Sequence, residues 1–223
     1  MKDVIKRILK KDLKSIENLK KNNIFLEFDE TNILRAKALL IGPENTLYEG
    51  TLLFFNIEFP NNYPHVPPIL HYISRNKIRI HPNIYANGKV CLSILGTWSG
   101  PSWTSSMDIS CVLLSLQSLL NDSPLNEEPG FGKYKGPLID QYNSAMEFNN
   151  IYSLFYRNTK YIPDNFIIFQ NEIYKNYNKY KLKNIEKINK KDKKKYNISM
   201  NIYKINIDID YNILLNKLNK FDI

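Results

Sequence analysis

One cysteine lies where its neighbours could support nucleophilic chemistry. Cys91 follows His81 and Asn83 within the stretch HPNIYANGKVCLSIL, residues 81 to 95. A cysteine thiolate is a strong nucleophile, and an acyl group bound to it as a thioester stays reactive towards amines. An isolated asparagine at such a position most often makes a side-chain-to-backbone hydrogen bond in a turn. Cys91 could therefore be a nucleophile, a buried apolar residue, a metal ligand or half of a disulfide.

The rest of the sequence narrows these alternatives. A zinc site takes about four ligands, and the two cysteines and three histidines form no such cluster, so we expect no metal. A disulfide between Cys91 and Cys111 would need an oxidising compartment, which the N-terminal sequence does not favour. Cys111 lies in the apolar stretch ISCVLLSLQSLL and is predicted to be an inert core cysteine.

The composition is typical of a globular protein with basic ends. Hydrophobic residues make up 43% of the chain, charged residues 24%, and the net charge is +9. Residues 1–22 hold eight Lys/Arg and three Asp/Glu, and residues 171–195 hold ten Lys and three acidic residues. The charged start MKDVIKR is a poor secretory signal, and no run approaches the roughly 18 apolar residues of a membrane span. We therefore expect a cytoplasmic or nuclear location, no membrane partner, and basic docking surfaces in preference to a nucleic-acid-binding fold.

The hydrophobic patterns predict an α+β fold. A helix is expected over residues 3–22, where apolar residues recur every three or four positions. The runs 24–28, 33–41, 51–59 and about 69–73 predict a four-stranded antiparallel meander. The long irregular segment 74–107 is typical of a functional region. The remaining expected helices, packed against one face of the sheet, are residues 107–122 with Asp108 as N-cap, 138–157 and 164–182.

The last forty residues are rich in Asn, Lys, Ile and Tyr. Within them the stretch YKINIDIDYNI alternates strictly between apolar and polar residues, which predicts a strand over residues 203–213. The alternative is a poorly ordered tail.

Taken together, these segments resemble the ubiquitin-conjugating enzyme (E2) family over about residues 1–160. The matching pieces occur in the family's order: IKRILKKDL, IGPENTLYEG, FPNNYPHVPPIL, HPNIYANGKVCLSIL and ISCVLLSLQSLL. The stretch GKVCLSILGTWSGPSWTSS looks most like the long-insert Z-type subgroup. The resemblance implies a UBC core domain over residues 1–160, with an N-terminal helix, a four-stranded meander and C-terminal helices, followed by a basic helical and Asn/Lys/Ile-rich extension over 161–223.

The resemblance also implies a reaction. Cys91 would accept ubiquitin or a ubiquitin-like modifier from an E1 as a thioester and pass it to a substrate lysine, usually with a RING or HECT E3, without a cofactor. Asn83 would stabilise the oxyanion or order the loop, and His81 would order the loop through hydrogen bonds. Glu127 or Glu128 would be the acid that prepares the incoming lysine, although either could equally be a solvated loop residue.

Docking surfaces follow from the same resemblance. The residues that match the family's E1 and E3 contacts are Lys6, Arg7, Lys10 and Lys11 on the first helix and Pro64, His65, Ser99, Pro101 and Ser102 in two loops. His65 departs from the pattern, which usually has Phe there. The non-enzymatic alternative is an adaptor of the same fold that binds a modifier without transferring it. A cysteine hydrolase is disfavoured because Cys91 follows NGKV in an irregular segment and does not begin a helix.

Overall fold

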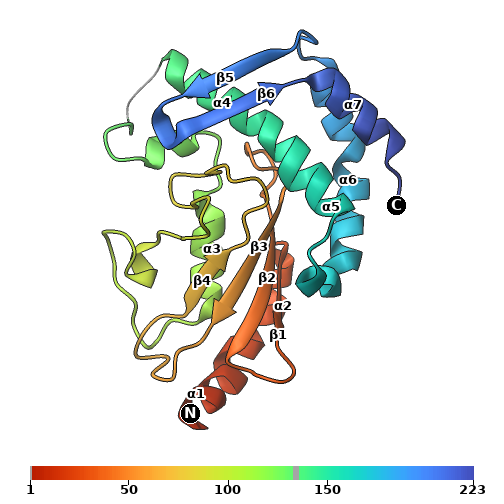
Figure 1. Ribbon diagram of the computed structural model, residues 1–223. Coiled ribbons are helices and arrows are strands. Elements are labelled where there is room, and N and C mark those ends of the chain that lie inside the picture. The colour runs from red at the N-terminus through yellow and green to blue at the C-terminus, as the bar shows by residue number, and fades with distance from the viewer. Residues whose placement is uncertain (1, 133–135) are drawn as a thin grey trace.

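A four-stranded antiparallel sheet forms the centre of the N-terminal part of the molecule (Figure 1). The computed structural model describes residues 2–132 and 136–223. Its strands pair in chain order, as the predicted meander requires. They are β1 (Ile24–Phe28), β2 (Arg35–Ile41), β3 (Leu52–Glu58) and β4 (Ile69–Tyr72).

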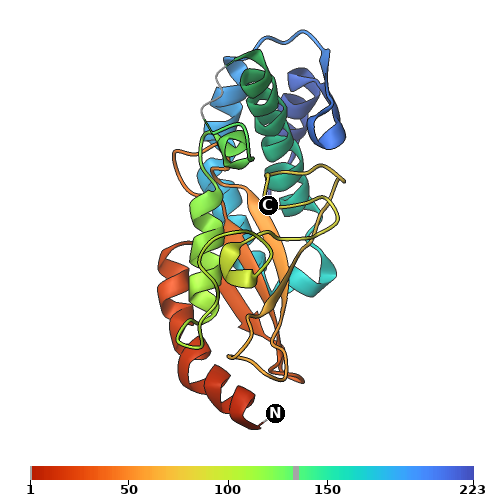
Figure 2. The same cartoon turned by 90° about the vertical axis from the view of Figure 1, so that its left-hand side faces the viewer.

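The predicted N-terminal helix covers one face of this sheet together with α3 (Ile109–Leu119) (Figures 1 and 2). It runs without a break through α1 (Lys2–Arg7), a π-helical turn (Ile8–Asp12), a 3-10 turn (Leu13–Ser15) and α2 (Ile16–Lys21). The Asp108 side chain accepts from the N–H groups of Ser110 and Cys111, which confirms it as the N-cap of α3. Alternate residues of β2 and β3, among them Leu40 and Phe55, fill the core between the sheet and these helices.

A buried carboxylate fixes the N-terminal helix against α3. Asp12 is fully buried, and its Oδ1 accepts from the Tyr63 hydroxyl at 2.6 Å and from the Ile109 N–H at 2.9 Å. Burial raises the pKa of Asp12 above its ordinary value, although both hydrogen bonds oppose the shift. One side chain therefore joins the first helix, the proline-rich segment and the start of the helix that follows the irregular segment.

The expectation that helices cover only one face of the sheet is wrong. A 3-10 segment (Asp164–Phe169) leads into α6 (Gln170–Asn189) on the opposite face. There Phe166 and Phe169 pack against apolar residues of β2 and β3, including Leu39 and Phe54. Both sides of these two strands are apolar, so they need a second cover to exclude water.

A second apolar cluster lies beyond the end of the sheet, in the upper part of Figure 1. It takes residues from both sides of the predicted domain boundary at residue 160. Its elements are α4 (Pro137–Asn149), a π-helical continuation (Asn150–Arg157), α6, the hairpin of β5 (Tyr196–Met200) and β6 (Ile205–Ile209), and α7 (Tyr211–Lys220); the short α5 (Asn158–Lys160) follows the π-helical segment. The C-terminal residues thus share a core with α4.

The predicted strand over residues 203–213 is wrong at both ends. Tyr203 and Lys204 have φ angles of 54° and 52° and belong to the turn before β6. The Asp210 side chain accepts from the Ile213 N–H at 2.9 Å and caps α7, so the chain becomes helical from Tyr211. The apolar alternation is genuine only over β6, and beyond it the apolar residues follow helical spacing.

Ion pairs anchor the lysine-rich segment to the rest of the chain. The Glu49 side chain, 5% exposed, pairs with Lys187 at 3.1 Å and also with Lys183. Lys179 pairs with Glu44 at 2.5 Å at a more exposed position. These lysines of α6 are therefore paired with carboxylates of the same chain, although their side chains stay partly exposed.

We expect Glu49→Gln to lower the free energy of unfolding by about 1 kcal/mol at neutral pH. The value is small because Lys183 and Lys187 are 47% and 36% exposed and water screens the pairs. Burial alone would raise the pKa of Glu49, but the two ammonium groups outweigh it and lower that pKa below 4.5. The contribution is therefore present above pH 4.5 and lost as the pH falls through the depressed pKa.

Denaturant unfolding across this pH range measures the effect. Glu44→Gln, which removes a surface pair of the same type, is the matched control and should change stability less. Equal effects of the two substitutions would contradict a special role for the buried carboxylate.

Candidate active site

Cys91 lies in the irregular segment after β4, two residues before a 3-10 turn (Ser93–Leu95). Its N–H donates to the Asn83 carbonyl at 2.8 Å, and the Asn83 side-chain amide donates back to the Cys91 carbonyl at 3.0 Å. The chain between them turns at Gly88, whose φ of 91° suits glycine and whose hydrogen faces the His71 ring, 2.2 Å from where a Cβ would be. These contacts hold Asn83 and Cys91 side by side.

His81 is fully buried and uses both ring nitrogens inside the loop. Nδ1 accepts from the Asn83 N–H at 3.0 Å, and Nε2–H donates to the Leu119 carbonyl at 3.0 Å. Burial lowers the pKa of His81 to about 3, and the charge of Arg79 adds to the shift, so the ring is neutral. With its lone pair committed to a backbone N–H, the ring connects the loop to the end of α3 and is not placed to take a proton.

Asn83 is 4% exposed, and its amide is held against the Cys91 backbone. Its Oδ1 is buried and receives no hydrogen bond from the described residues. The amide nitrogen carries two N–H groups, of which one donates to the Cys91 carbonyl. The side chain therefore places an N–H donor beside the backbone of Cys91.

Tyr85 is a neighbour of the thiol that sequence reasoning missed. Its hydroxyl is close enough to the Cys91 thiol for the two groups to affect each other's ionisation. Burial raises the pKa of Tyr85, and the nearby thiol adds to the shift. Cys91 itself is only 1% exposed. The signal in the sequence was the single aromatic residue between Asn83 and Cys91.

The structure distinguishes the two candidate acids. Glu127, the last residue of the 3-10 segment Pro124–Glu127, is exposed and accepts from the Asn121 side chain at 3.1 Å. Glu128 is 25% exposed at its side chain and pairs with Arg79 at 3.6 Å. The Arg79 guanidinium lies 3.7 Å from the centroid of the Tyr85 ring. Glu128, and not Glu127, therefore belongs to the group of side chains that reaches Cys91.

A family model described as ubiquitin-conjugating enzyme matches residues 8–149, the segment that carries this loop. The chain belongs to the ubiquitin-conjugating enzyme family. Ubiquitin-conjugating enzyme E2 Z of Homo sapiens is 41% identical over 146 residues, which cover 64% of this chain and 41% of that protein. The putative ubiquitin-conjugating enzyme E2 38 of Arabidopsis thaliana is 36% identical over 175 residues, covering 71% and 53%.

These matches agree with the resemblance to the Z-type subgroup, and the chain spans about half the length of the curated relatives it matches, or less. Among solved structures, a ubiquitin-conjugating E2 domain of Toxoplasma gondii is similar with a TM-score of 0.43 and 31% identity. That similarity covers 53% of this chain and 77% of that one.

The second cysteine of this E2-family chain differs from its prediction. Cys111 is half-buried, and its Sγ lies 3.7 Å from Asp108 Oδ1, outside the apolar clusters. The stripe of α3 that faces the sheet contains Val112, Leu113 and Leu116, so Cys111 is rotated away from it. The buried cysteine is therefore Cys91, which lies in the family's motif, and not Cys111.

The residues predicted to contact E1 and E3 divide into two groups. Arg7 donates to the Met107 carbonyl at 2.5 Å and Lys11 to the Ser106 carbonyl, which ties both to the loop before α3. Lys6 and Lys10 are exposed beside Leu9, which is 50% exposed. This split leaves a smaller basic surface, with an apolar residue at its centre, than the sequence predicted.

The two predicted tip loops lie next to each other. The Trp103 indole donates to the Pro64 carbonyl at 2.7 Å, and the Ser105 hydroxyl lies 3.5 Å from His65 Nδ1. Ser99, Pro101 and Ser102 are exposed on the loop that leads to Trp103. Their adjacency makes one continuous surface available to a partner, while the role of each residue stays a prediction.

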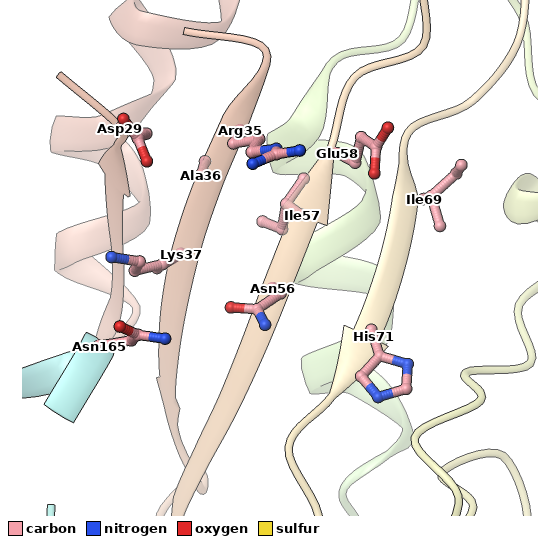
Figure 3. Close-up of a pocket in the computed structure, with 10 residues that line it drawn as sticks. All are labelled: Asp29, Arg35, Ala36, Lys37, Asn56, Ile57, Glu58, Ile69, His71 and Asn165. Carbon is pink, nitrogen blue, oxygen red and sulfur yellow. The ribbon is translucent and has the colours of Figure 1, made fainter. Parts of the chain in front are cut away.

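A hollow of about 400 Å³ opens on the outer face of the sheet (Figure 3). Its side chains carry mixed charge, with Arg35 opposite Glu58 on neighbouring strands and Lys37 near Asp29. None of the predicted catalytic residues lines it.

Among the described residues no cluster of three or more His, Cys, Asp or Glu could bind a metal ion, and no helix could span a bilayer.

Proposed function

We propose that this chain is an E2 that carries ubiquitin or a ubiquitin-like modifier as a thioester on Cys91 and transfers it to a substrate lysine. The observation that carries the proposal is the pairing of Cys91 and Asn83 by two reciprocal hydrogen bonds within the family's loop. The Cys91 sulfur attacks the E1 thioester carbonyl, so that a new C–S bond forms and the E1 thiol leaves. The lysine nitrogen then attacks, the C–N bond forms, and the Cys91 thiol leaves.

This reaction does not require a general base paired with the cysteine. Sulfur is intrinsically nucleophilic once ionised, and E1 would deliver an acyl group that is already activated. His81, a neighbour of Asn83 in the loop, is neutral and has both nitrogens engaged. The absence of a base from this position is consistent with thioester exchange and less consistent with a hydrolase.

Asn83 and Glu128 are proposed to act in the second step. As lysine attacks, negative charge develops on the carbonyl oxygen, and an amide N–H of Asn83 can donate to it. The lysine itself arrives charged, because its ordinary pKa is about 10.4. A carboxylate such as Glu128 attracts the ammonium group and can accept a proton from it, which frees the nitrogen lone pair before the C–N bond forms.

Partners follow from the same proposal. They are an E1, a RING or HECT E3, ubiquitin or a ubiquitin-like protein, and protein substrates, in the cytoplasm or nucleus. Because Cys91 is 1% exposed, loading needs a local movement of the groups around the thiol. The exposed helix surface of Lys6 and Lys10 and the paired loops of Pro64 and Trp103 are the proposed contact regions.

A panel of E1 and modifier pairs with ATP, read on a non-reducing gel, tests the proposal. The expected product is an adduct that depends on E1 and disappears on treatment with a thiol. No adduct with any pair would contradict the proposal. Modifier binding without an adduct would instead support the adaptor alternative.

A further inference from the structure

We propose that Tyr203, in the C-terminal extension, is a positioning residue of the active site that holds Glu128 and Arg79 on the side where the acceptor lysine approaches. The role rests on the proposed function and adds a residue from outside the segment that matches the family model, which ends at residue 149. The acceptor is a primary ammonium group, and Glu128 is the anion that would receive it.

A continuous chain of contacts links Tyr203 to the thiol. The Tyr203 hydroxyl donates to Glu128 Oε2. The Arg79 guanidinium lies between two aromatic rings, 4.0 Å from the centroid of Tyr203 and 3.7 Å from that of Tyr85. Tyr85 belongs to the same loop as Cys91, and the thiol helps to raise the pKa of its hydroxyl. Tyr203 is thus the outermost member of a cluster that ends at the proposed nucleophile.

The backbone conformation of Tyr203 is energetically unfavourable, so the contacts of the turn must stabilise it. Tyr203 and Lys204 both have positive φ angles, 54° and 52°, which side-chain-bearing residues rarely adopt. The turn is held because Met200 and Ile205 on either side of it are buried and the Tyr203 ring meets Tyr142 of α4, with centroids 6.1 Å apart. The hairpin therefore presents one defined side chain to the site.

The arrangement keeps Glu128 partly available. The distance from Glu128 Oε2 to Arg79 Nη2 is 3.6 Å, which is longer than the roughly 2.7–2.9 Å of a direct charge-assisted hydrogen bond. Both contacts use Oε2, and no described residue donates to Oε1. The Tyr203 hydroxyl occupies Oε2, the oxygen that Arg79 would also need for a bidentate pair. Without this hydroxyl, Arg79 could form a bidentate pair with Glu128 and compete with the lysine.

The test compares Tyr203→Phe with the parent chain in three single-turnover measurements. These are loading by E1, discharge of the thioester to free lysine, and discharge to hydroxylamine, a nucleophile that is neutral at neutral pH. Loading and hydroxylamine discharge should change by less than about twofold, while lysine discharge should fall roughly tenfold, as expected for a hydrogen bond to a charged group. Tyr196→Phe, at a 39% exposed position on β5, is the matched control and should leave all three rates unchanged.

A double-mutant cycle separates positioning from a structural effect. If Tyr203 acts through the carboxylate, Tyr203→Phe should have little further effect on lysine discharge in a Glu128→Gln background. An unchanged or faster lysine discharge in Tyr203→Phe would overturn the role, and so would equal losses with lysine and hydroxylamine. Failure of the parent chain to load would overturn the proposed function and this role with it, whereas normal loading isolates the role of Tyr203.

Discussion

Cys91→Ser is expected to eliminate the thiol-sensitive modifier adduct completely. A serine hydroxyl is a far weaker nucleophile than a thiolate, and no paired base is present in the loop to activate it. Any product that still forms would be an oxyester, with a C–O bond in place of the C–S bond. It would survive thiol treatment, so non-reducing and reducing gels of the same reaction distinguish the two.

Cys111→Ser provides the matched control. Cys111 is half-buried and outside the apolar clusters, so its substitution should leave both folding and the adduct intact. A thiol-sensitive adduct that persists in Cys91→Ser and disappears in Cys111→Ser would reverse the assignment. Mass spectrometry of the modified peptide identifies the attachment site independently.

Asn83→Ala is expected to slow discharge of the thioester to lysine by about 10²-fold, and loading by much less. The amide is the side chain fixed beside Cys91, and loss of one oxyanion donor costs about 10²–10³ in rate. Loading is expected to depend less on Asn83, because the acyl group that an E1 would deliver is already activated. Single-turnover discharge and loading rates, measured separately, test the difference.

Asn87→Ala is the control within the same loop. Asn87 is exposed, and its side chain accepts only from the Lys89 N–H at 3.1 Å among the described residues. Both rates should remain near those of the parent. If Asn83→Ala reduced loading and discharge equally, the amide would act by ordering the loop through the Cys91 carbonyl, and the oxyanion role would be wrong.

The sequence predicted the parts of the site that are close in the chain. His81, Asn83 and Cys91 lie within eleven residues, and the structure holds them together through bonds inside that loop. The sequence could not distinguish Glu127 from Glu128, because adjacent residues at the end of a 3-10 turn point in different directions. That choice depends on backbone geometry that the sequence pattern does not specify.

The missed contacts join distant segments. Tyr203 meets Glu128 across 75 positions and Arg79 across a larger separation, and local periodicity cannot predict contacts between residues so far apart. The four strands and the main helices were predictable because their apolar residues recur at regular spacing. The strand over 203–213 failed because Asp210, which is polar like the preceding alternate residues, is in fact a helix cap.

The apolar outer face of β2 and β3 constrains how chains of this kind can differ in length. Leu39, Phe54 and their neighbours are covered by Phe166 and Phe169, which lie after the segment that matches the family model. Loss of that cover would leave a hydrophobic patch on the sheet, which favours self-association. A viable shorter relative would therefore need polar residues at these strand positions, so the extension and the sheet surface beneath it are expected to evolve together.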